Sequence, residues 1–325
     1  MTSVLVTFQV SERSRPAMEQ ALNGLAELRF LSDFPPEGRP AALARAEVLL
    51  SWNPAGELGA EDIRALGKLR FLQLLSAGAD HLPLDLFPAQ VSIASNVGAY
   101  AGPMAEHVMA FVLALAKDLR GGHRKLVAGD FDQKTANRRI AGMSAGILGY
   151  GGIGKASARL MKAFGMRVEA INRSGRGDEN CDWAGSLDDL ETMLPRVDVL
   201  LVCLPLTAST AGLIGSRELG LMKDDAILVN VDRGEILVER DLYEHLRSHP
   251  RFTAGIDAWW KEPLRHGEFS MDYPFLELGN LLGTPHNSGI VPGAMQEARR
   301  MAVDNVRRFL AGENIGGRVN REEYR

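Results

Sequence analysis

Cysteine is scarce in this chain of 325 residues, which has only Cys181 and Cys203. Two thiols cannot build the dense disulfide framework of a small secreted domain. Cys203 lies in the apolar run Val199–Leu204, so we expect a buried thiol in a reducing compartment. The shortage of cysteine therefore favours a cytoplasmic protein.

Long apolar runs and a strong excess of one charge are missing as well. The most apolar stretch, Val108–Ala116, is bounded by His107 and Lys117 and is too short to span a bilayer. The N-terminus has neither a basic segment nor a small-residue cleavage site, and we interpret it as a first strand. A formal net charge of −4 argues against a nucleic-acid surface. We therefore expect neither a membrane nor a nucleic acid as partner.

The composition, with 46% hydrophobic and 24% charged residues, is ordinary for a soluble globular protein. A chain of 325 residues is long for one core, which favours two domains. Up to about residue 100, strand and helix patterns alternate, and helices such as Arg13–Leu25 and Glu61–Leu69 fall between the strands. This alternation predicts a parallel sheet covered on both faces. Its expected strands are Val4–Gln9, Leu28–Ser32, Val48–Trp52, Phe71–Leu75 and Val91–Ser95.

A helix over Pro103–Leu119, ended by Arg120-Gly121-Gly122, is expected to lead into the second domain. The polar segment Gly121–Gly142 is interpreted as an arm, and Ala294–Leu310 as a helix that returns to the first domain. Between them we expect a doubly wound sheet. Its six predicted strands are Ala145–Leu148, Arg167–Ile171, Val197–Leu204, Ala226–Val231, Phe252–Ile256 and Leu281–Gly283.

Three glycines separate the first of these strands from an amphipathic helix that ends at Gly165. Gly149, Gly151 and Gly154 have the spacing G-x-G-x-x-G. In a β-α-β unit such glycines allow a tight turn, backbone access for a pyrophosphate and close packing of helix on strand. The helix N-terminus adds N–H groups and a partial positive charge for the phosphates. We expect dinucleotide binding here, the alternative being a structural β-α turn.

The residues after the second strand of this unit bear on which dinucleotide binds. An NAD site usually has Asp or Glu there to hold the ribose 2′-hydroxyl, but the sequence reads Asn172-Arg173-Ser174-Gly175-Arg176. Two guanidinium groups and a hydroxyl suit a 2′-phosphate. The segment therefore predicts that NADP(H) is preferred, with NAD(H) possible. The alternative is a solvated surface loop.

Seven motifs in order along nearly the whole chain resemble those of the D-isomer-specific 2-hydroxyacid dehydrogenases. They are Leu75-Ser76-Ala77-Gly78-Ala79-Asp80, Ala105-Glu106-His107, Gly149–Gly154, Leu204-Pro205-Leu206-Thr207, Asn230-Val231-Asp232-Arg233-Gly234, Asp257–Pro263 and Thr284-Pro285-His286.

The resemblance implies two Rossmann-like or flavodoxin-like α/β domains with doubly wound parallel sheets and a cleft between them. It implies a discontinuous substrate domain formed by residues 1–101 and 290–325, and a dinucleotide-binding domain over residues 102–289. It also implies a homodimer joined through the dinucleotide-binding domain, with Gly121–Gly142 reaching the partner subunit.

Three residues carry the chemistry that the resemblance implies. Arg233, permanently charged and forked, suits holding a carboxylate and polarising a carbonyl. His286 can exchange a proton at neutral pH, and Glu262 can orient its imidazole. Asp232 departs from the family, where small residues are more usual, and need not touch the substrate because neighbouring strand residues face opposite ways.

We expect the substrate to contact Arg233, Tyr100 and the backbone N–H groups of Ala77 and Gly78. His107 is interpreted as a packing residue, and no residue spacing suggests a metal site. The residues expected to bind the cofactor are Gly149, Gly151, Gly152, Ile153, Gly154, Asn172, Arg173, Ser174, Arg176, Leu204, Pro205, Thr210, Val231, Asp257 and Ser288.

Together these features predict an oxidoreductase that transfers a hydride between NADPH and a 2-keto or D-2-hydroxy acid, such as glyoxylate or hydroxypyruvate. The rival hypothesis is a dinucleotide-sensing binding protein, because corepressors resembling the C-terminal binding proteins share this fold and even the Arg, Glu and His of the site. Fold alone cannot separate the two.

Overall fold

The computed structural model describes residues 1–324, which form two compact units. The first unit comprises Met1–Tyr100 together with the chain from Pro292 onward, and the second comprises Ala101–Val291. Each unit contains one sheet in which every pair of neighbouring strands is parallel. The expected fold class, two α/β units with parallel sheets, is confirmed.

The sheet of the first unit has the strand order β2-β1-β3-β4-β5. These strands are β1 (Thr2–Val6), β2 (Ala26–Phe30), β3 (Val48–Ser51), β4 (Phe71–Leu74) and β5 (Ser92–Ala94). Because side chains alternate along a strand, the two faces build separate cores. Val4 and Val6 pack in the core covered by α1 (Arg15–Leu22) and α12 (Ala294–Leu310). Leu5 packs on the other face with α2 (Arg39–Arg45) and α4 (Ala60–Arg64), and the short α3 (Pro54–Glu57) follows β3.

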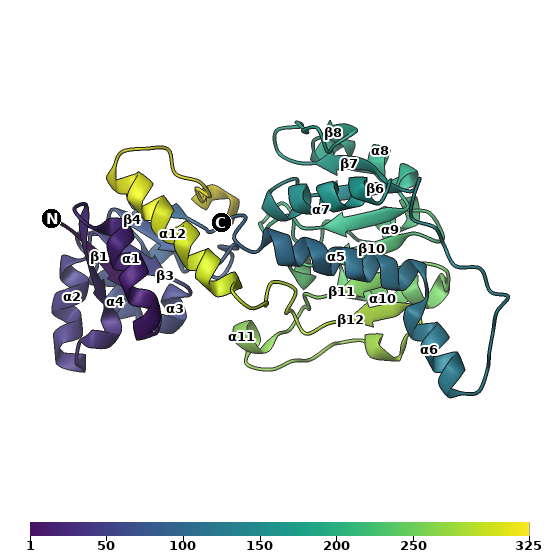
Figure 1. Cartoon of the computed structure of the whole chain (residues 1–325), viewed down its shortest axis with the longest axis horizontal. Helices are drawn as coiled ribbons and strands as arrows, with labels where there is room; N and C mark the ends of the chain where they lie inside the picture. The colour runs from purple at the N-terminus through teal and green to yellow at the C-terminus, as the bar shows by residue number, and fades with distance from the viewer. Residues whose placement is uncertain (325) are drawn as a thin grey trace. The chain divides into compact units, whose positions relative to one another are not determined.

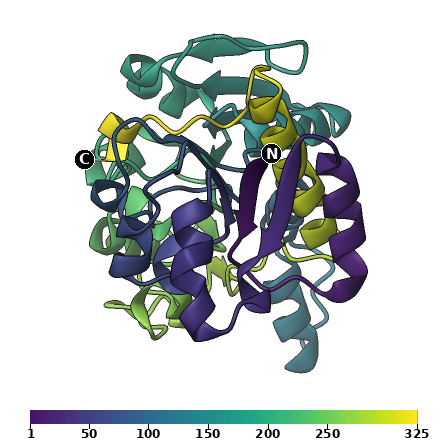
Figure 2. The same cartoon turned by 90° about the vertical axis from the view of Figure 1, so that its left-hand side faces the viewer.

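The chain after α12 returns to the first unit's sheet. Arg318 forms an antiparallel bridge with Ala94, and the Ser95 N–H donates to the Gly317 carbonyl at 2.8 Å. Figure 2 faces this unit and shows the yellow α12 beside the purple α1. The C-terminal segment thus completes a unit that begins at the N-terminus.

The sheet of the second unit has seven strands in the order β12-β11-β10-β9-β6-β7-β8. They are β6 (Ser144–Leu148), β7 (Arg167–Ile171), β8 (Trp183–Gly185), β9 (Val199–Val202), β10 (Ile227–Asn230), β11 (Thr253–Ile256) and β12 (Leu281–Gly283). The prediction of six strands missed β8, which has only three residues and no alternating pattern. The chain runs outward from β6 in one direction and from β9 in the other, so a topological switch lies between these two strands.

Helices cover both faces of this second sheet. One face carries α5 (Ala101–Ala116) and α7 (Gly152–Ala163), which lie next to each other in Figure 1. The other carries α8 (Leu190–Met193), α9 (Ser216–Leu221) and α10 (Glu239–Ser248). Both cores are built from the alternating residues of the same strands, which leaves the strand ends to form a site.

The predicted boundary between helix and arm is wrong. Instead of ending at Gly121-Gly122, the chain bends at Asp118 (φ 43°) and forms a second helix, α6 (Leu119–Val127). The Asp118 carboxylate accepts the Gly121 N–H at 3.1 Å, which caps this helix. A good N-cap stabilises a helix by about 1 kcal/mol, which offsets about 1 kcal/mol lost by one internal glycine. Residues 130–139 that follow have no helix or strand.

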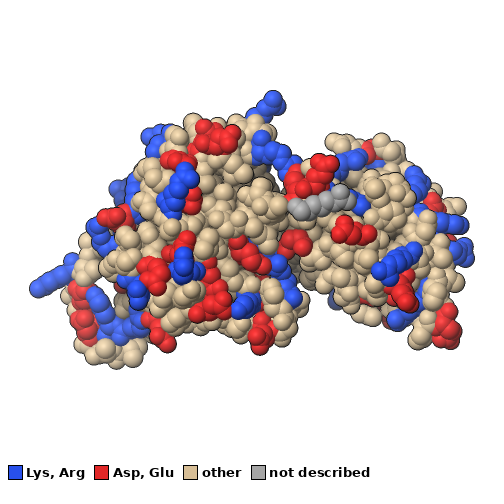
Figure 3. Space-filling view, turned by 180° about the vertical axis from the view of Figure 1, so that it is seen from behind, with Lys and Arg blue, Asp and Glu red and all other residues tan. Residues whose placement is uncertain are grey.

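Within residues 1–324, no helix combines the length and the apolar character that crossing a membrane requires. Figure 3 shows acidic and basic side chains mixed over the face it displays.

Candidate active site

The three residues expected to carry the chemistry follow three neighbouring strands of the second sheet. Arg233 comes after β10, Glu262 lies beyond β11 at the start of α11 (Pro263–His266), and His286 comes after β12. Carboxyl ends of parallel strands meet at one edge, where ligands of doubly wound sheets bind. The order of the strands therefore brings the three side chains to the same edge.

Glu262 and His286 are in direct contact. His286 Nδ1 lies 2.7 Å from Glu262 Oε2 and 2.9 Å from Oε1, and the Glu262 side chain is only 9% exposed. Burial by itself raises the pKa of the Glu262 carboxyl, but the hydrogen bond and charge of His286, the Trp259 N–H and the charge of Arg233 together lower it below its usual value. The carboxylate therefore stays ionised and favours the imidazolium form of its partner.

Trp259 holds the two segments that carry this pair. Its backbone N–H donates to Glu262 Oε1 at 2.7 Å, and its indole N–H donates to the Thr284 carbonyl at 2.8 Å. Trp260 is buried as well, donates to the Leu237 carbonyl at 2.7 Å and stacks on Phe275. The two tryptophans are thus part of the internal framework of the site.

Arg233 is held by its own turn. Its Nη1 donates to the Asp232 carbonyl at 2.8 Å, and its carbonyl accepts from the Asn230 side chain at 2.8 Å. Burial raises the pKa of the Cys203 thiol well above its ordinary range, and the negative charge of Asp232 adds to this effect. Asp232 lies near the end of β9, because the N–H of the preceding Val231 donates to the Val202 carbonyl of β9 at 3.3 Å.

The glycine loop has the geometry that its spacing predicts. Gly149 has φ 101°, and a Cβ there would lie 2.5 Å from the Cys203 carbonyl oxygen. A Cβ on Gly154 would lie 2.2 Å from the Gly149 carbonyl oxygen, so only glycine allows the helix to pack this close. Gly151 faces open space at the start of α7. An open backbone at the N-terminus of a helix fits the pyrophosphate of a dinucleotide.

The segment after β7 is shaped by Asn172. The side-chain oxygen of Asn172 accepts from the Ser174 N–H at 2.9 Å and from its hydroxyl at 2.7 Å. The amide nitrogen of Asn172 donates to the Arg176 carbonyl at 2.9 Å. This turn leaves Arg173, Ser174 and Arg176 exposed.

An acid two residues beyond Arg176 is already engaged. The hydroxyl of Tyr150, inside the glycine loop, donates to Asp178 at 2.5 Å, and Lys155 lies 3.4 Å from the same carboxylate. The Tyr150 hydrogen bond is the largest cause that lowers the pKa of Asp178. Asp178 thus joins the glycine loop to the Asn172–Arg176 turn.

The remaining residues expected to bind the cofactor lie at the same strand ends. Thr210 Oγ1 donates to the Pro205 carbonyl at 2.7 Å and accepts the Thr207 N–H at 2.8 Å, which fixes the turn after β9. Gly152 and Ile153 form the first turn of α7. The buried members of the full set are Gly154, Leu204, Thr210, Val231, Asp257 and Ser288.

The residues expected to contact the substrate from the first unit lie after β4 and β5. Ser76 Oγ donates to the Gly78 carbonyl at 2.9 Å, which shapes the Ala77–Gly78 turn. The Tyr100 hydroxyl donates to the Leu75 carbonyl at 3.3 Å, and burial raises its pKa. Its hydroxyl therefore has a structural partner within the same unit.

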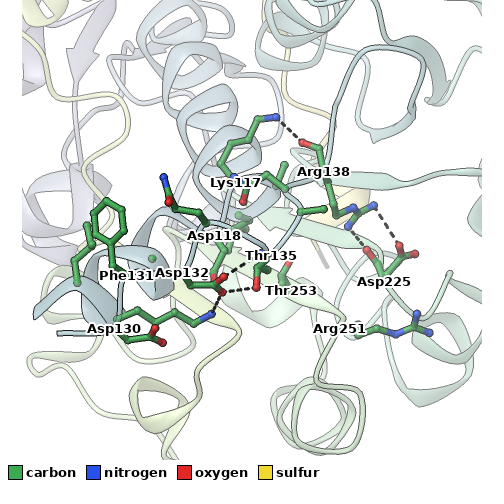
Figure 4. Close-up of a pocket in the computed structure, with 18 residues that line it drawn as sticks. Lys117, Asp118, Asp130, Phe131, Asp132, Thr135, Arg138, Asp225, Arg251 and Thr253 are labelled. Carbon is green, nitrogen blue, oxygen red and sulfur yellow. Dashed lines mark hydrogen bonds and ion pairs between the residues drawn. The ribbon is translucent and has the colours of Figure 1, made fainter. Parts of the chain in front are cut away.

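A cavity of about 550 Å³ lies away from the Arg233, Glu262 and His286 side chains. Figure 4 shows it between the end of α5, the 130–138 segment and the start of β11. Lys117 donates to the Arg138 carbonyl at 2.6 Å, and Arg138 in turn pairs with Asp225.

Sequence reasoning missed three contacts of the site, those of Trp259, Tyr150 and His107. The structure gives His107 a polar role in addition to packing, because its Nε2 lies 3.1 Å from Thr284 Oγ1. A histidine within an apolar helix was the only available signal, and it does not name a partner far along the chain. No cluster of three or more His, Cys, Asp or Glu side chains that could hold a metal occurs among residues 1–324.

A dinucleotide-binding sheet with an imidazole–carboxylate pair at its strand ends defines a nicotinamide-dependent oxidoreductase. The family model for "D-isomer specific 2-hydroxyacid dehydrogenase, NAD binding domain" matches residues 109–288. The chain belongs to the D-isomer specific 2-hydroxyacid dehydrogenase family. It is an enzyme that uses a nicotinamide dinucleotide and acts on small 2-hydroxy or 2-keto acids.

Curated proteins and solved structures agree with this family. A glycerate dehydrogenase of Methylorubrum extorquens is 31% identical over 262 residues, which cover 78% of this chain and 80% of that protein. A D-3-phosphoglycerate dehydrogenase of Methanocaldococcus jannaschii is 26% identical over 98% of this chain, which spans only 60% of its length. A D-isomer specific 2-hydroxyacid dehydrogenase from Xanthobacter autotrophicus, solved with NADPH and MES, has a TM-score of 0.83 and 26% identity, with 99% of each chain covered.

Proposed function

We propose that the protein is an NADPH-preferring reductase of small 2-keto acids, which converts glyoxylate to glycolate or hydroxypyruvate to D-glycerate. The observation that carries this proposal is the hydrogen-bonded pair of His286 and Glu262 at the strand ends that also present Arg233. A similar protein is a glycerate dehydrogenase, and glycerate is the reduction product of hydroxypyruvate.

In this reaction Arg233 binds the substrate carboxylate and polarises the neighbouring carbonyl with its fixed charge. His286 Nδ1 is engaged by Glu262, so Nε2 is the nitrogen that gives its proton to the carbonyl oxygen. Glu262 stabilises the imidazolium before that transfer and orients the ring throughout. NADPH, when bound, supplies the hydride for the keto carbon. The products are a 2-hydroxy acid and NADP⁺, and one proton is taken from solvent.

The first unit is proposed as the substrate domain, with the Ala77 and Gly78 N–H groups as further partners of the substrate carboxylate. The direct test measures oxidation of NADPH by the purified protein with glyoxylate, hydroxypyruvate and bulkier 2-keto acids. Turnover of at least one of these acids is expected. Tight binding of NADPH without turnover of any of them would contradict the proposal and favour a dinucleotide-sensing protein.

The proposed preference for NADPH rests on the Asn172–Arg176 turn. Its exposed Arg173, Ser174 and Arg176 suit a 2′-phosphate, while the nearby Asp178 is occupied by Tyr150. Arg173→Asp should weaken NADPH binding by about tenfold or more, the loss expected for a charge-assisted hydrogen bond, and should favour NADH.

Arg159→Asp is the matched control, because it makes the same charge change at an exposed position of α7. It should leave the ratio of the two dissociation constants unchanged. Equal affinity of the wild-type protein for NADPH and NADH would overturn the proposed preference.

We also propose a homodimer formed through the α6 region. This helix has no buried residue, and its apolar side chains are widely exposed, with Leu126 at 56% and Val127 at 76%. Phe131, just beyond the helix, is 74% exposed. Apolar groups gathered this way are typical of an interface.

Light scattering should give the mass of two chains for the wild-type protein. A Leu126→Ser/Phe131→Ser variant should give that of one chain, whereas Phe164→Ser, at the exposed end of α7, should remain dimeric. A wild-type monomer at micromolar concentration would contradict the proposal.

A further inference from the structure

The carboxylate of Asp257 is fully buried after β11, and every hydrogen bond it accepts from protein comes from the segment that carries His286. Thr284 Oγ1 donates at 2.5 Å and the Asn287 N–H at 3.1 Å, both to Oδ1. The Ser288 N–H donates to Oδ2 at 3.2 Å. Burying a carboxylate costs free energy unless hydrogen-bond donors surround it. Breaking any of these three bonds would therefore be unfavourable. Asp257 thus fixes the backbone on both sides of His286 through hydrogen bonds.

These hydrogen bonds matter for His286 because its backbone is in the left-handed conformation. Its φ is 50°, and Asp118 is the only other non-glycine residue with positive φ among residues 1–324. This conformation costs about 1 kcal/mol for an ordinary residue, and the surrounding contacts must offset it. In this conformation Nδ1 meets both oxygens of Glu262. The turn held by Asp257 therefore sets the geometry of the proton donor.

His107, on α5, contacts the Thr284 hydroxyl and so extends this series of hydrogen bonds. Its Nε2 lies 3.1 Å from Thr284 Oγ1 and 3.9 Å from Asp257 Oδ1. A threonine hydroxyl has one hydrogen, and Thr284 donates it to Asp257 Oδ1. His107 Nε2 must therefore carry a hydrogen and donate it to Thr284. The bonds run in one direction, from imidazole to hydroxyl to carboxylate.

We propose that His107 is a positioning residue for His286. By occupying the lone pair of the Thr284 hydroxyl, it aims that hydroxyl's hydrogen at Asp257, and Asp257 then maintains the left-handed turn at His286. Without the imidazole donor the hydroxyl is free to rotate, Asp257 loses its shortest bond, and His286 drifts from Glu262. The kinetic part of this inference rests on the proposed function of His286 as proton donor.

The kinetic test compares three variants in steady-state reduction of a 2-keto acid by NADPH. His107→Phe keeps an aromatic ring but removes the donor, and kcat should fall about tenfold, as expected for one lost hydrogen bond. KM and the dissociation constant of NADPH should stay within about twofold. His107→Gln places an amide N–H near the lost donor and should restore most of kcat. Phe111→Leu changes only the ring packed edge-on against His107 at 4.8 Å, and should leave kcat within about twofold.

A second set of variants tests the direction of the bonds and does not depend on His107 folding well as Phe. Thr284→Val nearly preserves volume but removes the hydroxyl, and should lower kcat as much as His107→Phe. The double variant should be no worse than either single one, because all three break the same chain of bonds. Multiplying losses, or an unchanged kcat in His107→Phe, would overturn the proposal.

A measurement that does not require catalysis distinguishes failure of this inference from failure of the proposed function. Nitrogen-detected NMR of the imidazoles in the cofactor-free protein should show His107 protonated at Nε2 in the wild type. In Thr284→Val the His286 ring signals should shift, which reports the loosened turn. A His107 protonated only at Nδ1, or His286 signals that do not move, would overturn the inference even if reduction is observed. If no 2-keto acid is reduced but these signals behave as expected, only the proposed function fails.

Discussion

Two histidines of the second unit have similar partial burial but opposite surroundings. His286 faces the carboxylate of Glu262, with Nδ1 2.7 Å from the nearer oxygen. His245, on α10, stacks on the ring of His249 at 4.1 Å and meets the edge of Phe252 at 4.6 Å. Its Nε2 is buried without a hydrogen-bond partner. Burial, followed by the charge of His249, lowers the pKa of His245 to about 4.

The comparison shows that the partner decides what a histidine can do. A neighbouring carboxylate favours the protonated form of an imidazole, whereas a second imidazole and apolar packing disfavour it. His245 is thus a neutral packing group, whereas His286 is the group proposed to carry the proton. Each of the following changes alters one side of this contrast.

The largest effect should come from removing the two rings in turn. His286→Ala should lower the turnover of 2-keto acid reduction by about 10²-fold or more, as expected for loss of a positioned acid. His245→Phe should keep turnover within about twofold, because that ring has no part in proton transfer. Steady-state kinetics with NADPH checks both. Near-normal turnover in His286→Ala would require another proton donor.

The next effect should come from removing the charge of the carboxylate while keeping its shape. The proposed reduction consumes the imidazolium form of His286, so activity should fall as pH rises. Glu262→Gln should move the pH of half-maximal reduction downward by about one unit or more, since an adjacent negative charge no longer favours that form. NADPH binding should be spared. Glu244→Gln, which removes an exposed carboxylate beside Arg247, should leave the pH profile in place.

The smallest effect should appear in the pH dependence of stability. In the folded state the pKa of His245 is about 4, below its ordinary value of 6.5, so the unfolded chain takes up the proton first. The stability that neutral His245 contributes is therefore complete above pH 6.5 and is lost as pH falls toward 4. His245→Phe should reduce the loss of unfolding free energy between pH 7 and pH 5 by about 1 kcal/mol, discounted for partial exposure. Urea unfolding at the two pH values measures it.

Glu262 affects stability in a lower pH range than His245, so urea unfolding at the same pH values distinguishes the two sites. The pKa of its carboxyl is lowered from an ordinary value of 4.5, so its contribution to stability is present above pH 4.5 and is lost only below it. Glu262→Gln should therefore not reduce the loss of unfolding free energy between pH 7 and pH 5, because the imidazolium of His286 also loses its carboxylate partner. A flattening equal to that of His245→Phe would contradict the assignment.

The alternation of apolar strands with helices was enough to predict both parallel sheets, because burial on both faces demands continuous apolar runs. The bounds of β7, β12 and α12 agree with the sequence pattern to the residue. Two errors have physical causes. β8 is only partly buried and lacks the apolar run that marks β12, and the Asp118 side chain caps α6, which offsets part of the cost of its two glycines.

The candidate site could be predicted in part for similar reasons. Motifs place Glu262 and His286 after adjacent strands, and parallel topology then brings them together. The bonds from Trp259 to Thr284 and from His107 to Thr284 join residues 25 and 177 positions apart. Such contacts depend on side-chain directions in the finished fold, which no local pattern of this chain encodes.

The hydrogen bond between Tyr150 and Asp178 has a consequence for changing the cofactor. The Asn172–Arg176 turn, which is proposed to recognise the 2′-phosphate, leads into Asp178. Asp178 is bonded to Tyr150 of the glycine loop and paired with Lys155 of α7. We therefore expect that the turn and the glycine loop can be replaced in an engineered variant only together. Replacing residues 172–178 with those of a relative of opposite cofactor preference would introduce new recognition groups but would lose the hydrogen bond that positions them. Residue 150 should therefore be replaced together with residues 172–178.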